Sequence, residues 1–198
     1  MTKKLTYQAL TSRNWDDFEA LFGSRGAYGG CWCMWWRKTR REFERDQGQA
    51  NKEHMRSIVE RGVKPGILVY HDQTPIGWCS IAPRKDFASL ERSPVLKRLD
   101  DEPVWSLVCI FIDGGWRGLG AAVEVVSLAV AYAFNNGAEI VEAYPTVTNG
   151  QKRAPVSIFM GTPHVFDQAG FVVCKQASKS KLIMRCSRSG NSYGEEED

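Results

Sequence analysis

The sequence has few of the residues that usually hold a metal ion. Its three histidines stand far apart, at positions 54, 71 and 164, and its six cysteines are scattered apart from the CxC pair of Cys31 and Cys33. A structural zinc site normally requires paired cysteines or histidines at set spacings, which one CxC pair does not supply. We therefore expect no metal site.

Long apolar segments and a large excess of one charge are also absent. No apolar run approaches the roughly 20 residues needed to span a membrane, and the first residues contain no apolar signal-peptide core. The net charge is only +3, and no basic helix carries interleaved aromatic residues, which argues against a nucleic-acid partner. We expect no membrane association and interpret the cysteines as reduced thiols of a cytoplasmic protein.

What is present is the composition of a globular domain, with 43% hydrophobic and 25% charged residues in a chain of 198. This length suits one domain with a substantial core. We expect the domain to occupy residues 1–186. The segment 187–198 is polar, ends in acidic residues and is expected to be disordered.

The most informative stretch runs from Pro103 to Asn136. Residues 104–113 are almost wholly apolar and rich in β-branched and aromatic types, which predicts a strand buried on both faces. Glycines end the strand, and from Ala121 the apolar residues recur at helical spacing. A strand, a glycine loop and a helix in this order can bind phosphate through loop N–H groups at the positive end of the helix dipole.

Two common phosphate-binding motifs do not fit this loop. A P-loop has a lysine followed by serine or threonine after its glycines, and none follows here. A dinucleotide-binding fingerprint needs glycine or alanine where this chain has Val123. A nucleotide-binding or dinucleotide-binding α/β protein is therefore a hypothesis that the motif argues against.

The flanking segments alternate between strand and helix patterns. Strands are predicted at 5–10, 67–71, 76–81, 138–144, 171–175 and 181–186, and helices at 11–22, 51–61 and from Thr162–Pro163. The strand–helix–strand order between 104 and 144 implies a right-handed crossover that joins parallel neighbours. We expect an α/β (α+β) fold with a mixed central sheet.

The arrangement Arg117-Gly118-Leu119-Gly120-Ala121-Ala122, directly after an apolar strand, resembles the pyrophosphate loop of the GNAT acyl-CoA N-acetyltransferases. The segment VFDQAGF at 165–171 is similar to the closing helix and Gly-Phe ending of that family. The runs GGCWCMWWR, PIGWCSIAPR and VEAYP look like an uncharacterised bacterial subgroup. The resemblance covers roughly residues 5–186 and implies a mixed sheet of about six to seven strands, helices on both faces and splayed central strands.

The resemblance also implies acetyl-CoA as co-substrate, with residues carried over by position. The backbone of Ile110, Phe111 and Ile112 is expected to contact the pantetheine arm. The pyrophosphate is expected to bind Trp116, Arg117, Gly118, Leu119, Gly120, Ala121 and Ala122. The implied reaction is direct attack on the thioester by a primary amine of a small molecule, a peptide or a protein. Since edge strands in such folds often pair, a homodimer is a further expectation.

The catalytic residues are less clearly marked. Glu142 is the leading candidate for a general base because it falls within a predicted strand beside the cleft, but a paired or solvent-facing carboxylate fits equally well. Many relatives have a tyrosine that protonates the leaving thiolate where this chain has Phe166. The acid is therefore sought elsewhere, in His164, Tyr144, Thr162 or water. An acyl-cysteine at Cys79 or Cys109 is disfavoured, since neither has a histidine nearby in the sequence.

Trp32, Trp35 and Trp36 fall within a few residues of each other, just after a glycine-rich segment. They are predicted to form either one wall of the acceptor site or part of the core, since aromatic residues serve both purposes. Overall, the sequence favours an acetyl-CoA-dependent N-acetyltransferase. A non-catalytic acyl-CoA-binding or sensor module of the same fold is the alternative, because Phe166 has no proton to give.

Overall fold

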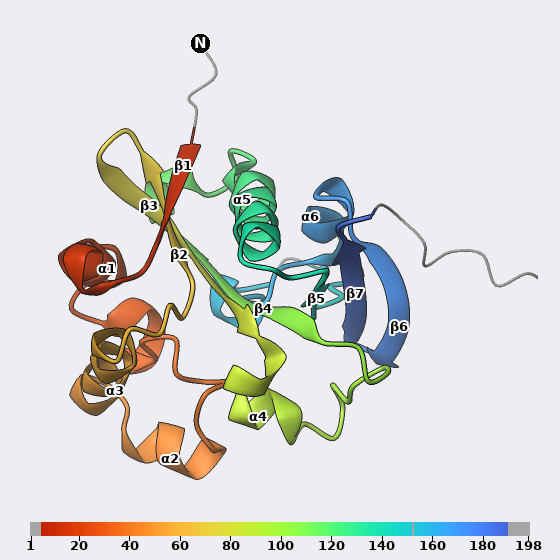
Figure 1. The fold of residues 1–198 in the computed structure, drawn as a ribbon, viewed down its shortest axis with the longest axis horizontal. Helices are drawn as coiled ribbons and strands as arrows, with labels where there is room; N and C mark the ends of the chain where they lie inside the picture. Colours follow the sequence, from red (N-terminus) through yellow and green to blue (C-terminus); the bar gives the residue numbers. More distant parts are fainter. Residues whose placement is uncertain (1–4, 152, 190–198) are drawn as a thin grey trace, which may run out of the picture.

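A computed structural model describes residues 5–151 and 153–189. The described residues form one mixed sheet whose strands run in the order β1-β2-β3-β4-β5-β7-β6 (Figure 1). The strands are β1 (Leu5–Ala9), β2 (Ile67–His71), β3 (Thr74–Pro83), β4 (Val104–Ile112), β5 (Ile140–Ala143), β6 (Val172–Ser178) and β7 (Lys181–Ser187). The mixed α/β sheet expected from the sequence is confirmed.

The helices cover both faces of this sheet. They are α1 (Trp15–Phe22), α2 (Arg40–Arg45), α3 (Gln49–Glu60), α4 (Ala88–Glu91), α5 (Ala121–Asn135) and α6 (Pro163–Gln168). Figure 1 shows α5 and α6 together on one face, while α1, α3 and α4 lie toward the other.

Strand β2 illustrates why its sequence is continuously apolar. Ile67 and Val69 belong to the core cluster under α5, whereas Leu68 and Tyr70 belong to the cluster under α1 and α3. Successive side chains of a strand point to opposite faces, so a strand covered by helices on both sides needs no polar position.

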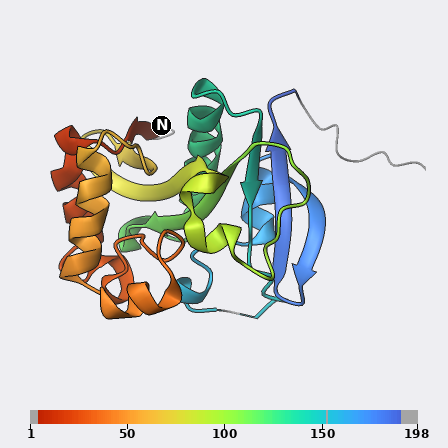
Figure 2. The ribbon, with the colours of Figure 1, turned by 60° about the horizontal axis from the view of Figure 1, so that its bottom comes forward.

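The centre of the sheet contains the feature that organises the site. β4 and β5 pair in parallel only from Val104↔Ile140 to Leu107↔Ala143, while β4 continues to Ile112. Beyond Leu107 the two strands separate, and Figure 2 shows β4 turning away from β5, which runs beside β7. We call this opening the splay. It is the arrangement expected for the central strands.

Strand β7 extends one residue beyond the predicted strand at 181–186, to Ser187. The expected disorder of the tail concerns residues that lie mostly outside the described part of the chain, since the description ends at residue 189.

Candidate active site

The glycine loop joins the end of β4 to the start of α5. Gly118 and Gly120 have φ angles of +78° and +80°, in the left-handed region that glycine adopts without steric cost. A Cβ built on either glycine would meet no heavy atom within 4 Å, so this side of the loop is open. α5 begins at Ala121, and its first-turn N–H groups point out of the positive end of the helix. Together these groups can bind an anion.

The side chains of the loop divide into two groups. Leu119 is 72% exposed, and the exposed Arg117 donates from Nε to the carbonyl of Ile112 at 2.8 Å. Trp116 packs instead against His71, with ring centroids 4.8 Å apart. Ala121 is buried and Ala122 is half-buried at the start of the helix, so both would offer an anion mainly their backbone N–H groups.

Two of the three expected pantetheine contacts face the splay. The Ile110 N–H donates across it, whereas the Asp113 N–H donates to Ile76 on β3 at 2.9 Å. Because backbone groups alternate along a strand, Ile112 turns its N–H to the splay and Phe111 turns its N–H to β3. The Phe111 N–H therefore does not face the splay, and the expected backbone contacts with the arm stay a prediction. Its side chain packs on Phe22 at 5.3 Å, on the face covered by α1.

The splay is not empty at its narrow end. The segment Phe159–Gly161 bridges the separating strands: the Ile110 N–H donates to the Phe159 carbonyl at 2.7 Å, and the Thr146 N–H donates to the Gly161 carbonyl at 2.9 Å. Gly161 has a φ of +80°, and a Cβ there would lie 2.6 Å from the Phe166 ring. A ligand that bonds to the Ile110 N–H must replace the Phe159 carbonyl.

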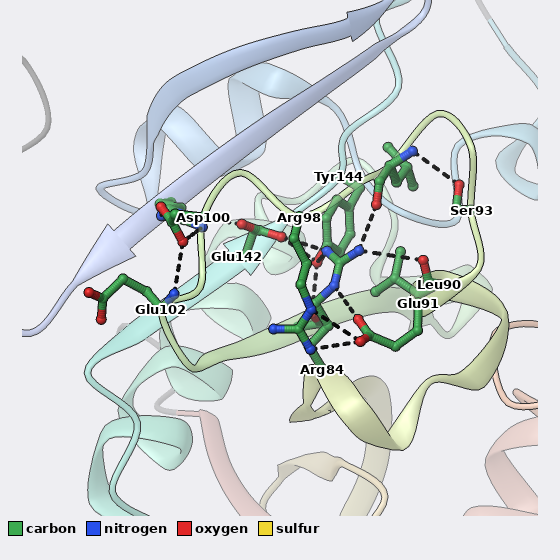
Figure 3. A network of polar contacts seen from close by, with 12 residues as sticks. Arg84, Leu90, Glu91, Ser93, Arg98, Asp100, Glu102, Glu142 and Tyr144 are labelled. Atoms are coloured by element: carbon green, nitrogen blue, oxygen red, sulfur yellow. Dashed lines mark hydrogen bonds and ion pairs between the residues drawn. The ribbon is translucent and has the colours of Figure 1, made fainter.

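Glu142 lies in a buried network of polar side chains between β5 and the chain that follows β3 (Figure 3). One carboxylate oxygen accepts from Arg84 Nη1 at 2.8 Å, and the other accepts from Arg185 Nε at 2.8 Å. Glu142 is 1% exposed and both arginines are 2% exposed. Of the two alternatives open from the sequence, the paired carboxylate is the arrangement found.

Tyr144 belongs to the same network. Its hydroxyl donates to Glu142 at 2.7 Å and accepts from Arg84 Nη1 at 2.8 Å, and the Ser106 hydroxyl lies 2.7 Å away. Burial and the neighbouring Glu142 carboxylate raise the pKa of Tyr144 well above its usual value. The Tyr144 proton is thus held within the network.

Arg84 and Arg185 were not identified from the sequence. Arg84 also binds Glu91 at 2.6 Å and the Leu96 carbonyl at 2.6 Å, and Arg185 binds Asp100 at 2.6 Å. An arginine within PIGWCSIAPR gives no local sign that it will be buried. The one sequence signal is Glu142 itself, because a carboxylate inside an otherwise apolar strand needs a positively charged partner.

The remaining acid candidates lie around α6. His164 is exposed on this short helix, and its role stays a prediction. Phe166 is fully buried and packs edge-on against Phe171, with centroids 5.1 Å apart. Thr162 precedes the helix, and its side chain accepts no capping hydrogen bond from the helix N–H groups. None of the three is joined to the Glu142 network by a described hydrogen bond.

The three tryptophans separate in the structure. Trp32 is buried in the core cluster under α1 and α3 and stacks on Phe22, with centroids 5.6 Å apart. Trp35 is 38% exposed and meets Phe43 edge-on. Trp36 is half-buried against the cluster that contains Tyr144 and Met160, and its buried Nε1–H has no hydrogen-bond partner among the described residues. The three tryptophans therefore have different surroundings, and their place in the acceptor site stays a prediction.

Three of the six cysteines, Cys31, Cys33 and Cys109, lie in or against the core cluster on the face covered by α1. Cys33, at a φ of +58°, accepts from Trp78 Nε1 at 3.2 Å. Hydrogen bonding by the Cys109 thiol, with further help from Trp78 and Ser80, lowers the pKa of Cys33 to about 7. Within the described ranges, no cluster of three or more histidine, cysteine or acidic side chains is arranged to hold a metal ion. No helix in those ranges is long and apolar enough to span a bilayer.

Lys181 is a further residue missed from the sequence. It begins β7, bridges to Thr146 and reaches the narrow end of the splay. Its ammonium donates to Thr146 Oγ1 at 2.8 Å, Tyr144 O at 3.3 Å and Met160 Sδ at 3.3 Å. Burial lowers the pKa of Lys181 to about 8. No sequence signal marks it, because Lys175 and Lys179 stand in the same hairpin.

The chain was compared with protein families, curated proteins and solved structures. A family model described as the acetyltransferase (GNAT) family matches residues 31–154. A search of curated proteins finds no significant match, whereas many solved structures are similar.

Three of these structures show the breadth of the fold. A ribosomal-protein-S5-alanine acetyltransferase from Vibrio fischeri has 12% identity and a TM-score of 0.57, covering 98% of each chain. The enzyme AAC(6')-Ib, in complex with ribostamycin and coenzyme A, has 13% identity and a TM-score of 0.55, covering 94% of each chain. The PaiA N-acetyltransferase of Thermoplasma acidophilum, in complex with coenzyme A, has 12% identity and a TM-score of 0.52, covering 93% of this chain and 99% of that one.

Proposed function

Because this chain belongs to the acetyltransferase (GNAT) family, we propose that it transfers the acetyl group of acetyl-CoA to a primary amine by direct attack on the thioester. The observation that carries this proposal is the open loop of Gly118 and Gly120, placed between a splayed strand and the start of α5. Left-handed glycines beside a helix N-terminus suit close approach of a pyrophosphate. Arg117 stands beside them and can add charge-assisted bonds.

The pantetheine arm would then lie along β4 and pair with the Ile110 and Ile112 backbone as a strand would. The Ile110 N–H is also the donor best placed to stabilise the thioester oxyanion, because it points into the splay. Since the Phe159 carbonyl accepts from this N–H, binding of the arm requires the Phe159–Gly161 segment to move.

For catalysis, we assign Glu142 and Tyr144 a positioning role. Both oxygens of Glu142 accept from arginines and the Tyr144 hydroxyl donates to Glu142, so they fix the end of β5 beside the splay. We propose His164, which is exposed near the start of α6, as the proton donor to the leaving thiolate. With few fixed groups in the site, water would carry part of the proton transfer.

The acceptor is proposed to be a small-molecule amine or a peptide or protein amino group, used in the cytoplasm. The similar structures include AAC(6')-Ib with ribostamycin and the NatC complex bound to Gag peptide and CoA, at 11% identity and a TM-score of 0.51. Trp36 is the tryptophan that we propose for the acceptor site, since it packs against the core cluster that includes Tyr144 and Met160. A homodimer also remains a proposal.

The competing function is a non-catalytic acyl-CoA sensor of the same fold, which Phe166 and the paired Glu142 favour. Release of free coenzyme A from acetyl-CoA, followed with a thiol reagent, separates the two functions. The panel would contain ribostamycin, a peptide with an N-terminal alanine and a lysine-rich peptide. Amine-dependent thiol release above the protein-free rate supports the enzyme. Saturable coenzyme A binding without turnover on any amine favours the sensor.

A further inference from the structure

Lys181 differs from the other buried lysines described in this chain. Lys38 binds the Asp46 carboxylate at 2.9 Å, and Lys52 binds Glu19. The three acceptors around Lys181 Nζ are a carbonyl, a hydroxyl and a thioether, and none carries a charge. Among the described residues, Lys181 takes part in no ion pair. An ammonium without a counterion is poorly stabilised when it is half-buried.

The Lys181 amine lies on the splay side of β5. The Pro145 carbonyl and the Val147 N–H bond to the chain that begins β7. Since backbone groups alternate in direction along an extended chain, Tyr144 O and Thr146 N point the other way, into the splay. Lys181 Nζ reaches over to that side and binds Tyr144 O at 3.3 Å.

One segment covers both this amine and the proposed oxyanion donor. The Phe159 carbonyl accepts from the Ile110 N–H at 2.7 Å, and the next residue, Met160, contacts Lys181 Nζ through its sulfur at 3.3 Å. When the segment moves to admit an acyl-CoA, it uncovers both groups. A thioester oxygen that replaces the Phe159 carbonyl on Ile110 would bring the thioester into the part of the splay that Phe159 and Met160 cover, where the Lys181 amine also lies.

We propose that Lys181 is itself an acyl acceptor, taking the acetyl group of acetyl-CoA on its ε-nitrogen. This inference rests on the proposed function, because the acyl-CoA must enter the splay. The neutral amine attacks the thioester carbon, a C–N bond forms and the C–S bond breaks. The coenzyme A thiolate leaves and takes up the proton released from Nζ, so the products are acetyl-Lys181 and coenzyme A.

The pKa of about 8 supports this chemistry. Near pH 8 about half of such a group is neutral, against roughly 0.4% of a lysine with the usual pKa of about 10.4. An amine with a lower pKa is also a weaker nucleophile. By analogy with thiols, this reduces the expected rate advantage of Lys181 by about one order of magnitude. The remaining advantage is about tenfold, before any gain from positioning.

The test uses the wild-type protein and measures acetylation site by site. The protein is incubated with acetyl-CoA near pH 8, and the acetyl occupancy of each lysine is measured over time by mass spectrometry after digestion. Lys175 and Lys179 are internal controls, because both are exposed in the same β6–β7 hairpin. A parallel incubation uses acetyl phosphate, an acetyl donor without the coenzyme A moiety, and a third adds excess coenzyme A as competitor.

We expect Lys181 to be acetylated at least about tenfold faster than Lys175 or Lys179. Excess coenzyme A should suppress modification of Lys181 alone, and acetyl phosphate should give no preference. The Lys181 rate should level off above about pH 8.5 while the control rates continue to rise. Equal rates at the three lysines, or the same preference with acetyl phosphate, would overturn the inference.

A thermal shift with coenzyme A distinguishes this failure from failure of the proposed function. If coenzyme A stabilises the protein but Lys181 is not preferred, the self-acetylation inference is wrong and the proposed function stands. If coenzyme A has no effect, both are wrong.

Discussion

Arg84 and Glu142 form an ion pair at 2.8 Å in which the side chains are only 2% and 1% exposed. Arg84 follows β3 and Glu142 lies in β5, so the pair links segments on either side of β4. Arg185 binds the second Glu142 oxygen at 2.8 Å. A carboxylate between two buried guanidinium groups holds the end of β5 in place where the splay begins.

Replacing Glu142→Gln should therefore destabilise the fold. The substitution removes the carboxylate that the two buried arginines share. Because Arg84 keeps Glu91 and Arg185 keeps Asp100, the cost should be at most about 3–5 kcal/mol. Chemical denaturation measures this loss. The control is Glu139→Gln, because Glu139 is 70% exposed and lies 3.6 Å from the half-exposed Arg188. This surface change should alter the free energy of unfolding by about 0.5 kcal/mol or less. A Glu142→Gln variant of normal stability but greatly reduced turnover would instead identify Glu142 as the base.

Substitution of Gly120→Leu should weaken coenzyme A binding while the protein remains folded. The left-handed φ of +80° penalises any larger residue, but no neighbouring atom blocks the side chain, so the folding cost should be about 1–2 kcal/mol. The new side chain would occupy the open side of the loop, where the phosphates are proposed to bind. Titration with coenzyme A should show a dissociation constant at least about tenfold higher, which is a loss of about 1.4 kcal/mol of binding free energy.

The matched control is Gly62→Leu. Gly62 follows α3, has the same φ of +80° and also has no heavy atom within 4 Å of a built Cβ. It should have a similar folding cost and unchanged affinity for coenzyme A. If both variants lost binding equally, strain rather than the loop would be the cause, and the proposed phosphate site would be wrong.

The tryptophans should respond differently to truncation. Trp32→Ala removes a buried ring stacked on Phe22 and should cost about 3–5 kcal/mol of stability. Trp35→Ala, at a side chain that is 38% exposed, should cost about 1 kcal/mol or less. Trp36→Phe keeps the packing and removes the unpartnered Nε1–H, so its effect should fall on acceptor affinity. Thermal melts and acceptor titrations of the three variants check this order. Equal losses of stability would contradict the separation of their roles.

The stability of the protein should fall in acid partly through Asp100. Its hydrogen bond from Arg185 holds the pKa of Asp100 below the usual value. A carboxyl group whose pKa is lower in the folded state stabilises the protein at pH values above the pKa that the group has in the unfolded chain, which is near 4. That contribution is lost as the pH falls further through the folded value.

Asp100→Asn should therefore lower stability at neutral pH and flatten the decline below about pH 4. Asp101→Asn is the control, because Asp101 is an exposed neighbour. Melting temperatures measured between about pH 2 and pH 7 decide the matter. An acid limb that is unchanged in Asp100→Asn would show that the Arg185 contact contributes nothing.

The fold could be predicted from local patterns because its central elements are strongly periodic. The apolar run that became β4, the glycine loop and the helical spacing of α5 all depend on short-range sequence, and their order implied the parallel β4–β5 pair. Local sequence does not show which backbone groups of β4 face β3 and which face the splay. The sequence therefore predicts a contact by Phe111 as well as by Ile110 and Ile112, although the Phe111 N–H faces β3.

The polar contacts of the site could not be predicted from local sequence patterns. Arg84 meets Glu142 across 58 residues, and Lys181 meets Tyr144 across 37. Nothing in the residues beside Arg84 or Lys181 indicates these partners, because the strand order brings them together. The surroundings of Trp32 and Trp36 differ for the same reason: tertiary packing, which the local sequence does not show, buries Trp32 in one core cluster and places Trp36 against another.

The most direct test of the central claim is a ligand-induced thermal shift of the wild-type protein with acetyl-CoA, coenzyme A, NAD and ATP. A ligand present at about a hundred times its dissociation constant stabilises the folded state by about 2.7 kcal/mol, which a melt resolves easily. The account predicts stabilisation by acetyl-CoA and coenzyme A and none by NAD or ATP. No shift with either coenzyme A species, or an equal shift with NAD or ATP, would contradict an acyl-CoA site at the β4–α5 loop.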